Sequence, residues 1–221
     1  MARIVLLRHA HSVANEKNLL AGRTPGISLS KVGREQALEL VNRIGSMKFD
    51  EIAVSPMQRC RETIDPWIES QGATTLVIDE SISEVDYGSW SGKSLASLRR
   101  KAQWKVVQDF PSQMIFPEGE SLLEMQGRAL SGFYRLNSVK GKGPRLLVSH
   151  GDVIKSIVAH CLGMHLDQFQ RLVIEPASIT IIDTDAGMSR LVRFNDGKGY
   201  LGSSRSTNQS AIGGSTGNTD K

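Results

Sequence analysis

Short apolar runs alternate with longer amphipathic segments along most of this chain. The runs at residues 4–7, 51–54 and 146–148 are rich in branched side chains and have the length of buried strands. Two later runs, at 179–182 and 191–194, are further strand candidates. Strands that alternate with helices predict a largely parallel sheet covered on both faces, which is a three-layer α/β/α fold.

The segments between these runs have helical periodicity. Residues 31–47 carry apolar side chains on one face, and Ser30 stands at the position of an N-cap. The segment 121–137 opens with Ser-Leu-Leu-Glu, which is a capping-box pattern. The other predicted helices span residues 58–70, with Pro66 as a kink or a restart, 94–108 and 152–163.

A change of composition divides the chain near its end. From about residue 203 onward the residues are mostly small and polar, and such a segment cannot bury enough apolar surface to become ordered. A total of 221 residues suits one domain with a tail. We therefore predict one domain over residues 1–202 and a flexible polar tail over 203–221.

The remaining composition excludes several classes of protein. The net charge is only +4 and aromatic residues make up 5%, whereas a nucleic-acid reader usually has a basic stripe with stacking aromatics. No apolar run approaches the length of a membrane span, and the first residues do not form a signal peptide. Two cysteines do not make a disulfide framework. We expect a cytoplasmic protein that binds neither nucleic acid nor membrane.

Polar side chains stand at the ends of the three strongest strand candidates. The first strand ends in Arg8 and His9, the second is followed by Arg59, and the third is followed by His150. The carboxyl ends of parallel strands meet at one edge of the sheet, where ligands bind in open α/β folds. We therefore expect these four side chains to form one site.

The residue types in this predicted site suit a phosphoryl group. Arginine offers a rigid fork of donors that matches phosphate oxygens, and histidine can act as a nucleophile at neutral pH. Helices that follow the strands would aim their N-termini at the same edge, which favours an anion there. The chain has neither an aspartate-rich cluster for magnesium nor a glycine-rich phosphate loop with lysine.

A phosphoryl transfer also needs an acid that protonates the leaving oxygen. A carboxyl group can do this if its pKa is raised toward neutrality. The stretch 79–88 contains several carboxyl groups. Periodicity alone does not choose between Glu84 and Asp86.

Seven ordered motifs resemble those of the histidine phosphatase superfamily, also called the phosphoglycerate mutase-like family. They are LRHAHSxAN at 7–15, GRTP at 22–25, LSxxG at 29–33, SPMQRCRET at 55–63, EVDYGSWSG at 84–92, PEGES at 117–121 and VSHGDVIK at 148–155. These motifs span roughly residues 3–194, and so many in the family's order make a chance match very improbable. The nearest likeness is to an actinobacterial branch of phosphomutases and phosphatases.

The resemblance implies specific roles. His9 would be the phosphorylated nucleophile, and Glu84 would be the proton donor. Arg8, Arg59 and His150 would bind the phosphoryl group and its transition state. The fold would be a mostly parallel sheet between helices, and the family resemblance implies no metal and no organic cofactor.

Other positions concern the substrate. The predicted substrate-binding residues are Ser12, Asn15, Gly22 and Arg23. His11 stands where the family usually has glutamate, and we expect it at the edge of the pocket. Lys155 replaces a usual arginine, so both departures bear on substrate specificity. The basic segment 93–105 is either a solvated helix face or, through Arg99, Arg100 or Lys101, a contact to a second anionic group of the substrate.

The sequence therefore predicts a metal-independent phosphomonoester phosphatase of the histidine acid phosphatase type, acting on a small phosphorylated metabolite. The alternative is a phosphoglycerate mutase-type phosphomutase, which must keep the same phosphohistidine dry under a closing cover. The compact spacing of the motifs and the polar tail favour hydrolysis. A non-enzymatic phosphate-binding module would have lost a core residue, and none is lost. The sequence leaves a homodimer open.

Overall fold

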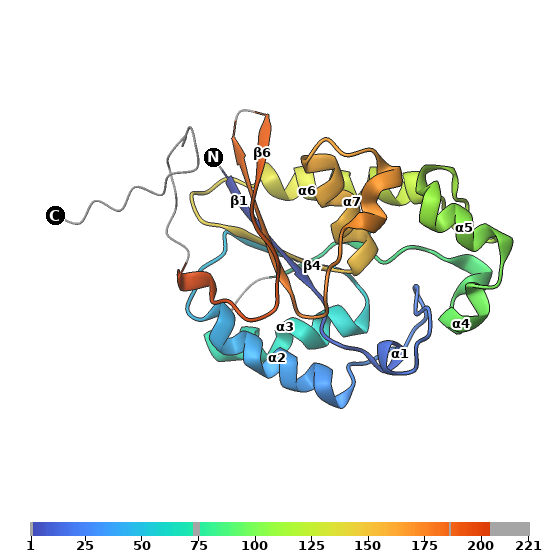
Figure 1. Cartoon of the computed structure of the whole chain (residues 1–221). Helices are drawn as coiled ribbons and strands as arrows, with labels where there is room; N and C mark the ends of the chain where they lie inside the picture. Colours follow the sequence, from blue (N-terminus) through green and yellow to red (C-terminus); the bar gives the residue numbers. More distant parts are fainter. Residues whose placement is uncertain (1, 73–75, 186, 204–221) are drawn as a thin grey trace.

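The centre of the molecule is a six-stranded sheet in the order β3-β2-β4-β1-β5-β6 (Figure 1). The structure is a computed structural model that describes residues 2–72, 76–185 and 187–203. The strands are β1 (Ala2–Arg8), β2 (Glu51–Val54), β3 (Val77–Ile78), β4 (Arg145–Ser149), β5 (Ile179–Asp185) and β6 (Met188–Asp196). Pairing is parallel from β3 to β1, whereas β5 and β6 are antiparallel to their neighbours. The sheet is thus mostly parallel, as predicted.

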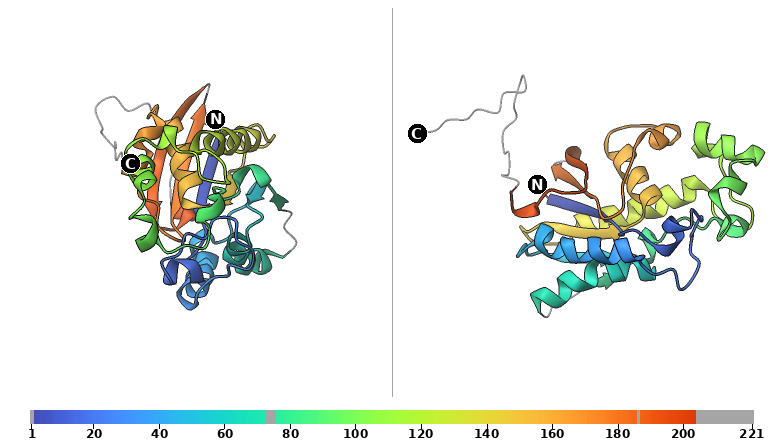
Figure 2. Two further views of the ribbon diagram at one scale, coloured as in Figure 1. Left: turned by 90° about the vertical axis from the view of Figure 1, so that its right-hand side faces the viewer. Right: turned by 60° about the horizontal axis from the view of Figure 1, so that its bottom comes forward.

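Helices cover both faces of this sheet (Figures 1 and 2). They are α1 (Val13–Glu16), α2 (Lys31–Ile44), α3 (Gln58–Gln71), α4 (Leu95–Leu98), α5 (Ala102–Asp109), α6 (Leu122–Asn137) and α7 (Gly151–Cys161). Helices α2 and α3 pack on one face, and α6 and α7 pack on the other. This arrangement confirms the predicted three-layer α/β/α fold.

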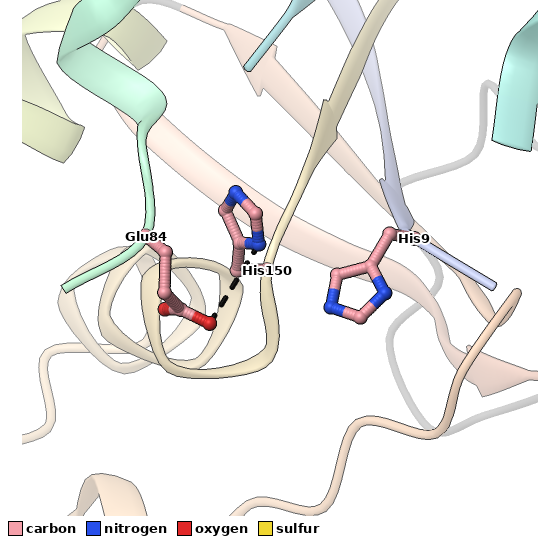
Figure 3. A group of neighbouring side chains, drawn as sticks. All are labelled: His9, Glu84 and His150. Carbon is pink, nitrogen blue, oxygen red and sulfur yellow. Dashed lines mark ion pairs between the residues drawn. The ribbon is translucent and has the colours of Figure 1, made fainter. Parts of the chain in front are cut away.

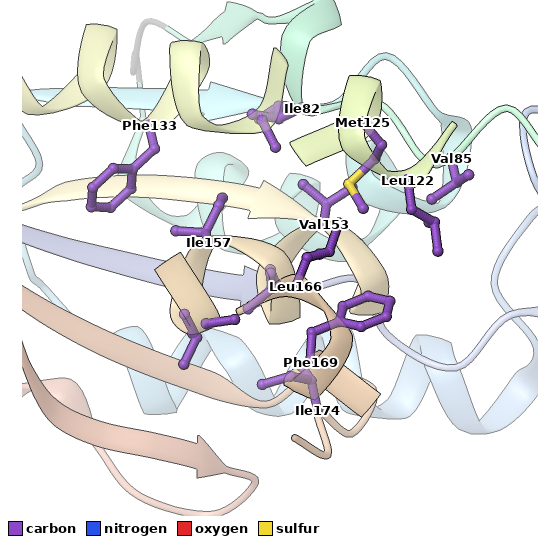
Figure 4. Packing of buried hydrophobic residues seen from close by; sticks show 14 of the residues in the cluster. Ile82, Val85, Leu122, Met125, Phe133, Val153, Ile157, Leu166, Phe169 and Ile174 are labelled. Carbon is purple, nitrogen blue, oxygen red and sulfur yellow. The ribbon is translucent and has the colours of Figure 1, made fainter. Parts of the chain in front are cut away.

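Both faces of strand β1 are covered by helices, which explains why its apolar run contains no polar residue. Ile4 and Leu6 point into the cluster under α6 and α7, while Val5 and Leu7 point into the cluster under α2 and α3. Successive side chains of a strand face opposite sides, so a strand that is covered on both faces must be apolar throughout. Figure 4 shows the first of these two clusters.

The parallel register brings the strand ends together. Arg8 pairs with Ser149, and Val54 pairs with Val148. The residues that follow β1, β2 and β4 therefore emerge at the same edge of the sheet. Helices α4 and α5 extend from this end of the molecule (Figures 1 and 2).

The predicted helix over 94–108 is wrong as a continuous element. The chain forms the short helices α4 and α5, with a break at residues 99–101. Leu98 and Val107 are both buried. Residues nine positions apart lie about half a turn out of phase on one straight helix, because each residue advances about 100°. The break allows both side chains to face the core.

Two other elements differ from the sequence pattern. Helix α3 continues through Pro66 to Gln71 rather than restarting there. Strand β3 was not predicted, since its two residues, Val77 and Ile78, are exposed and form no buried run.

The predicted tail at 203–221 lies outside the described residues except for its first residue. Among the described helices, none is long and apolar enough to cross a membrane.

Candidate active site

A cavity of ≈ 450 Å³ opens at the edge where the parallel strands end. Six residues that the sequence predicts for the site line it: Arg8, His9, Ser12, Asn15, Arg59 and Glu84. His150 lies beside them, and its ring centroid is 5.3 Å from that of His9. In Figure 3, His9, Glu84 and His150 approach one another from three separate segments of the chain.

His9 directly follows β1 and is almost fully buried. Its backbone N–H donates to the carbonyl oxygen of Ser149 at 2.9 Å, which ties it to the end of β4. Its ring Nδ1 lies 2.7 Å from the carbonyl oxygen of Ala10. A carbonyl oxygen can only accept, so Nδ1 carries the hydrogen and Nε2 keeps its lone pair. This tautomer is the one that a nucleophilic Nε2 requires.

The surroundings of His9 keep its ring neutral. Burial lowers the pKa of His9 well below the usual value of 6.5, and the positive charges of Arg59 and Arg8 lower it further. The ring therefore does not need to lose a proton before it attacks an electrophile at neutral pH.

Each ring nitrogen of His150 has a hydrogen-bond partner. Arg59 Nη2 donates to Nδ1 at 3.1 Å. Nε2 must then carry the hydrogen, which it donates to Ser55 Oγ at 2.8 Å. Burial lowers the pKa of His150 well below 6.5, with Arg59 and His9 acting in the same direction. His150 is thus a neutral group that orients Arg59.

Two arginines supply the positive charge of the cavity. Arg59 also donates to the carbonyl oxygen of Gly22 at 3.0 Å, and Arg8 donates to the carbonyl oxygen of Ile174. The Nε atoms of Arg8 and Arg59 are buried without a hydrogen-bond partner among the described residues. A buried unpaired donor is costly, and the oxygens of a phosphoryl group would satisfy both.

Of the two carboxyl groups that periodicity left open, Glu84 is the one that lines the cavity. Its Oε1 accepts from the Val85 backbone N–H at 3.0 Å, and its Oε2 lies 3.6 Å from Arg59 Nη2. Burial raises the pKa of Glu84, although Arg59 opposes this shift. A carboxyl group with a raised pKa can retain a proton for transfer to a leaving oxygen. Asp86 does not line the cavity, and its Oδ1 accepts from the Gly88 N–H at 3.0 Å.

Helix α7 begins directly after His150 and points its N-terminus at the cavity. Gly151 and Asp152 line the cavity, and no side chain caps the first turn. Unpaired backbone N–H groups and the helix dipole favour an anion at such a terminus. A Cβ at position 151 would lie only 3.3 Å from the Arg8 guanidinium carbon, so glycine allows the start of α7 to approach Arg8 closely.

Ser12 and Asn15 shape the loop after His9. Ser12 caps α1, with its Oγ accepting from the Asn15 N–H at 3.2 Å. In return, Asn15 Oδ1 accepts from the Ser12 backbone N–H at 3.0 Å and from its hydroxyl at 2.9 Å. Both residues line the cavity, so the predicted substrate-binding positions lie where a substrate can reach them.

Gly22 and Arg23 do not line the cavity. The Gly22 carbonyl oxygen holds Arg59. Arg23 donates to the Glu84 carbonyl oxygen at 2.9 Å and to Glu120 Oε1 at 3.0 Å. The guanidinium of Arg23 is therefore engaged in bracing the segment that carries Glu84, rather than directed at a substrate.

His11 and the basic side chains of the segment 93–105 also lie away from the cavity, although Leu95 of that segment lines it. His11 Nδ1 is 2.8 Å from Ser30 Oγ, so this ring packs against the start of α2. Arg99, Arg100 and Lys101 are exposed and are not among the lining residues. The structure thus gives none of them a contact with the cavity.

The sequence reasoning did not assign Tyr87 and Asp152 to the site, and it linked Lys155 to substrate specificity without finding its partners. Tyr87 donates its hydroxyl hydrogen to Asp152 Oδ2 at 2.8 Å. Lys155 Nζ lies 2.7 Å from Asp152 Oδ1 and 2.8 Å from Gln170 Oε1. The signal was present, because Asp152 and Lys155 stand three residues apart in the helix that follows His150. Residues at this spacing share a helix face.

The same group of side chains resembles a metal site in composition. Donor atoms of His9, Glu84 and His150 lie within 4.8 Å of one another (Figure 3). However, Arg59 Nη2 stands 3.1 Å from His150 Nδ1 and 3.6 Å from Glu84 Oε2. A fixed guanidinium at this distance repels a divalent cation. With Arg59 at this distance, the site suits an anion better than a metal ion.

Two arginines, a neutral histidine nucleophile and a protonatable carboxyl group at the carboxyl edge of an α/β/α sheet are typical of a phosphoryl-transfer enzyme. The histidine phosphatase superfamily (branch 1) matches residues 4–197 of this chain. The chain belongs to this superfamily.

Individual relatives agree with this assignment. The chain is 31% identical over 198 residues to a Hydrogenobacter thermophilus protein that carries the name of a phosphoserine phosphatase, covering 88% of this chain and 96% of the relative. It is 32% identical over 196 residues to a 2,3-bisphosphoglycerate-dependent phosphoglycerate mutase of Parvibaculum lavamentivorans, covering 82% and 90%. The fold matches Bacillus stearothermophilus YhfR with a TM-score of 0.82 at 24% identity, covering 89% and 98%.

Proposed function

We propose that this protein is a phosphomonoester phosphatase that acts on a small phosphorylated metabolite through a phosphohistidine at His9. The observation that carries the proposal is the bond from His9 Nδ1 to the Ala10 carbonyl oxygen, which leaves Nε2 unprotonated in a cavity with two arginines. Arg8 and Arg59 bind the phosphoryl oxygens together with the N-terminus of α7.

The first step forms the phosphoenzyme. Nε2 of His9 attacks phosphorus, the ester P–O bond breaks, and the Glu84 carboxyl gives its proton to the leaving oxygen. In the second step the Glu84 carboxylate takes a proton from water, and the hydroxide formed attacks phosphorus and breaks the P–N bond. The products are the alcohol and inorganic phosphate, and His9 and Glu84 return to their starting states.

A phosphomutase is the second candidate, and the phosphoglycerate mutase relative favours it. A mutase would return the phosphoryl group from His9 to another hydroxyl of the bound product, which requires water to be kept out. The compact spacing of the motifs supports hydrolysis. Further parts of the proposal are the likeness to the actinobacterial branch, a cytoplasmic location and the absence of any cofactor.

The deciding experiment is hydrolysis of p-nitrophenyl phosphate in excess EDTA by the native protein and His9→Ala. We expect turnover in EDTA and a loss of at least about 10³-fold in the variant, because the phosphoenzyme cannot form. His160→Ala serves as the matched control, since His160 is exposed, does not line the cavity, and has its Nε2 2.8 Å from the Tyr134 hydroxyl. Turnover that survives in His9→Ala would refute the mechanism.

A second assay separates the two candidate functions. The native protein is incubated with 3-phosphoglycerate, and released phosphate and 2-phosphoglycerate are both measured. Formation of 2-phosphoglycerate faster than phosphate would replace the phosphatase proposal with the mutase.

A further inference from the structure

Beyond the two phosphoryl-binding arginines, the cavity has a further cationic side chain, and that side chain is already engaged within the protein. Among the described lining residues, Lys155 is the only lysine or arginine besides Arg8 and Arg59. Its Nζ lies 2.7 Å from Asp152 Oδ1, 2.8 Å from Gln170 Oε1 and 4.6 Å from the Phe169 ring centroid. An ammonium group has three hydrogens, of which the Asp152 and Gln170 oxygens accept two, and the group also lies over the Phe169 ring. Lys155 is therefore not free to bind a substrate anion.

Asp152 is fixed in the position that neutralises Lys155. It lies in the first turn of α7, and its second carboxylate oxygen accepts from the Tyr87 hydroxyl at 2.8 Å. Burial would raise the pKa of Asp152, but Lys155 and Tyr87 hold it below its usual value. Asp152 thus remains a carboxylate beside the cavity. Glu175 adds a second carboxylate to the lining.

Two stretches of the cavity wall are apolar, beside the polar side chains of Ser12 and Asn15. One stretch comes from Leu19, Leu20 and Leu95, whose segments are joined by the bond from the Leu20 N–H to the Lys93 carbonyl oxygen at 2.9 Å. A second stretch comes from residues 172–174, which are Leu, Val and Ile. Such walls suit the carbon skeleton of an alcohol or phenol and offer no partner to a second charged group.

We propose that the site selects phosphomonoesters whose phosphate is their only anionic group and whose alcohol part is uncharged and largely apolar, with Asp152 as the residue that excludes a second anion. This inference rests on the proposed phosphatase function and narrows its substrate class. It ranks carboxylated substrates such as phosphoglycerates and phosphoserine below neutral alkyl and aryl phosphates.

The test compares three substrates that share a phenyl phosphate frame: phenyl phosphate, 4-carboxyphenyl phosphate and 4-carbamoylphenyl phosphate. The carbamoyl group matches the carboxylate in size and lacks its charge. We expect kcat/KM for the carboxylated ester to be at least about 10-fold below that for the carbamoyl ester, because Asp152 occupies Lys155 and the Glu175 carboxylate repels the added charge. The ionised carboxylate withdraws electrons from the phenol less than the carbamoyl group does, so the ratio is compared with the one that the pKa values of the two phenols predict.

Asp152→Asn tests the assigned residue. The substitution keeps the side-chain shape and an oxygen for the Tyr87 hydroxyl, but it releases the charge of Lys155. We expect the ratio of kcat/KM for the carboxylated and carbamoyl esters to rise at least about fivefold in this variant. A ratio within one protein is unaffected by a general loss of active enzyme. Asp109→Asn, which removes the same charge from the exposed end of α5, should leave the ratio unchanged.

The outcomes separate the two proposals. No release of phosphate from phenyl phosphate would refute the phosphatase function itself. Release from all three esters, with the carboxylated ester equal to or better than the carbamoyl ester, would refute the substrate inference and leave the phosphatase standing. An unchanged ratio in Asp152→Asn would overturn the role of Asp152. In the variant Asp152→Asn with Lys155→Met, the gain for the carboxylated ester should disappear.

Discussion

Burial shifts the pKa values of His9 and Glu84 in opposite directions. Desolvation disfavours the charged form of each group, and the charged form is protonated for histidine but deprotonated for a carboxylic acid. The pKa of His9 is therefore lowered and that of Glu84 is raised. One buried environment thus favours a neutral nucleophile and a protonated acid, which is the pair of states that the first step requires.

The residue-scale prediction concerns Glu84→Gln. The variant cannot protonate an alkoxide, so we expect kcat/KM for an alkyl phosphate to fall by about 10²–10⁴. The value for p-nitrophenyl phosphate should fall much less, because nitrophenolate leaves without a proton. Equal losses on both substrates would argue against proton donation by Glu84.

The pH profile provides the same test in another form. Activity of the native protein on an alkyl phosphate should decline as pH rises through the Glu84 pKa, which lies above its usual 4.5. On the acid side, protonation of His9 should inhibit only below its usual 6.5, because its pKa is lowered. Glu84→Gln should remove the alkaline decline. Persistence of that decline would assign it to another group.

At the scale of elements, the packing of α2 against the loop after His9 leaves no room for a side chain at Gly33. A Cβ at this position would lie 1.9 Å from the carbonyl oxygen of His11. That contact places the start of α2 directly against the nucleophile loop. The Ser30 Oγ also accepts from the Gly33 N–H at 3.1 Å, so the cap and the close approach occur together.

The element-scale prediction is a pair of glycine variants. Gly33→Ala should lower the free energy of unfolding by about 1–3 kcal/mol, because backbone must move to relieve the contact. Gly127→Ala is the matched control in the exposed part of α6, where a Cβ would meet nothing within 4 Å. There alanine should stabilise by about 0.5–1 kcal/mol through helix propensity. Urea unfolding measures both, and equal effects would contradict the close packing.

The interrupted helix at 94–108 shows a limit of reading elements from periodicity. A single stripe of Leu95, Leu98, Ala102 and Val106 predicted one helix, but the buried residues are Leu98 and Val107. Which apolar residues face the core depends on the surface that the helix meets. That surface is built by other segments, so local spacing does not reveal it.

At the scale of the whole molecule, Arg43 connects α2 to segments more than 130 residues away. Its guanidinium donates to the carbonyl oxygens of Ala177 at 2.8 Å, Asp196 at 2.8 Å and Gly199 at 3.3 Å. These carbonyl groups lie just before β5 and at or beyond the end of β6. Arg43 is buried, so its charge is offset by these oxygens rather than by water.

We predict that Arg43→Gln lowers the free energy of unfolding by about 3 kcal/mol, because three carbonyl oxygens lose a charged donor. Arg99→Gln, at an exposed position, should change it by no more than about 0.5 kcal/mol. Thermal and urea unfolding provide the measurement. A loss below about 1 kcal/mol for Arg43→Gln would show that this connection contributes little.

The sequence by itself determined the sheet apart from the short edge strand β3, and the location of the site. Continuous apolar runs are sufficient to recognise strands buried on both faces, and parallel strands necessarily align their ends. The positions of Arg8, His9, Arg59 and His150 after such strands therefore predicted their meeting, and the ordered motifs indicated the family. All of these are properties of local sequence and of the geometry that parallel sheets share.

Only the tertiary structure decided which neighbours each site residue has. Periodicity left Glu84 and Asp86 open and the family motifs implied Glu84, whereas the fold shows that Glu84 lines the cavity, that Arg23 braces it from outside, and that Asp152 neutralises Lys155. Each of these outcomes depends on contacts with the surrounding fold, and side chains two residues apart in a loop can point anywhere relative to a cavity. Protonation and tautomer depend on burial and on hydrogen-bond partners, and these exist only once the chain is folded.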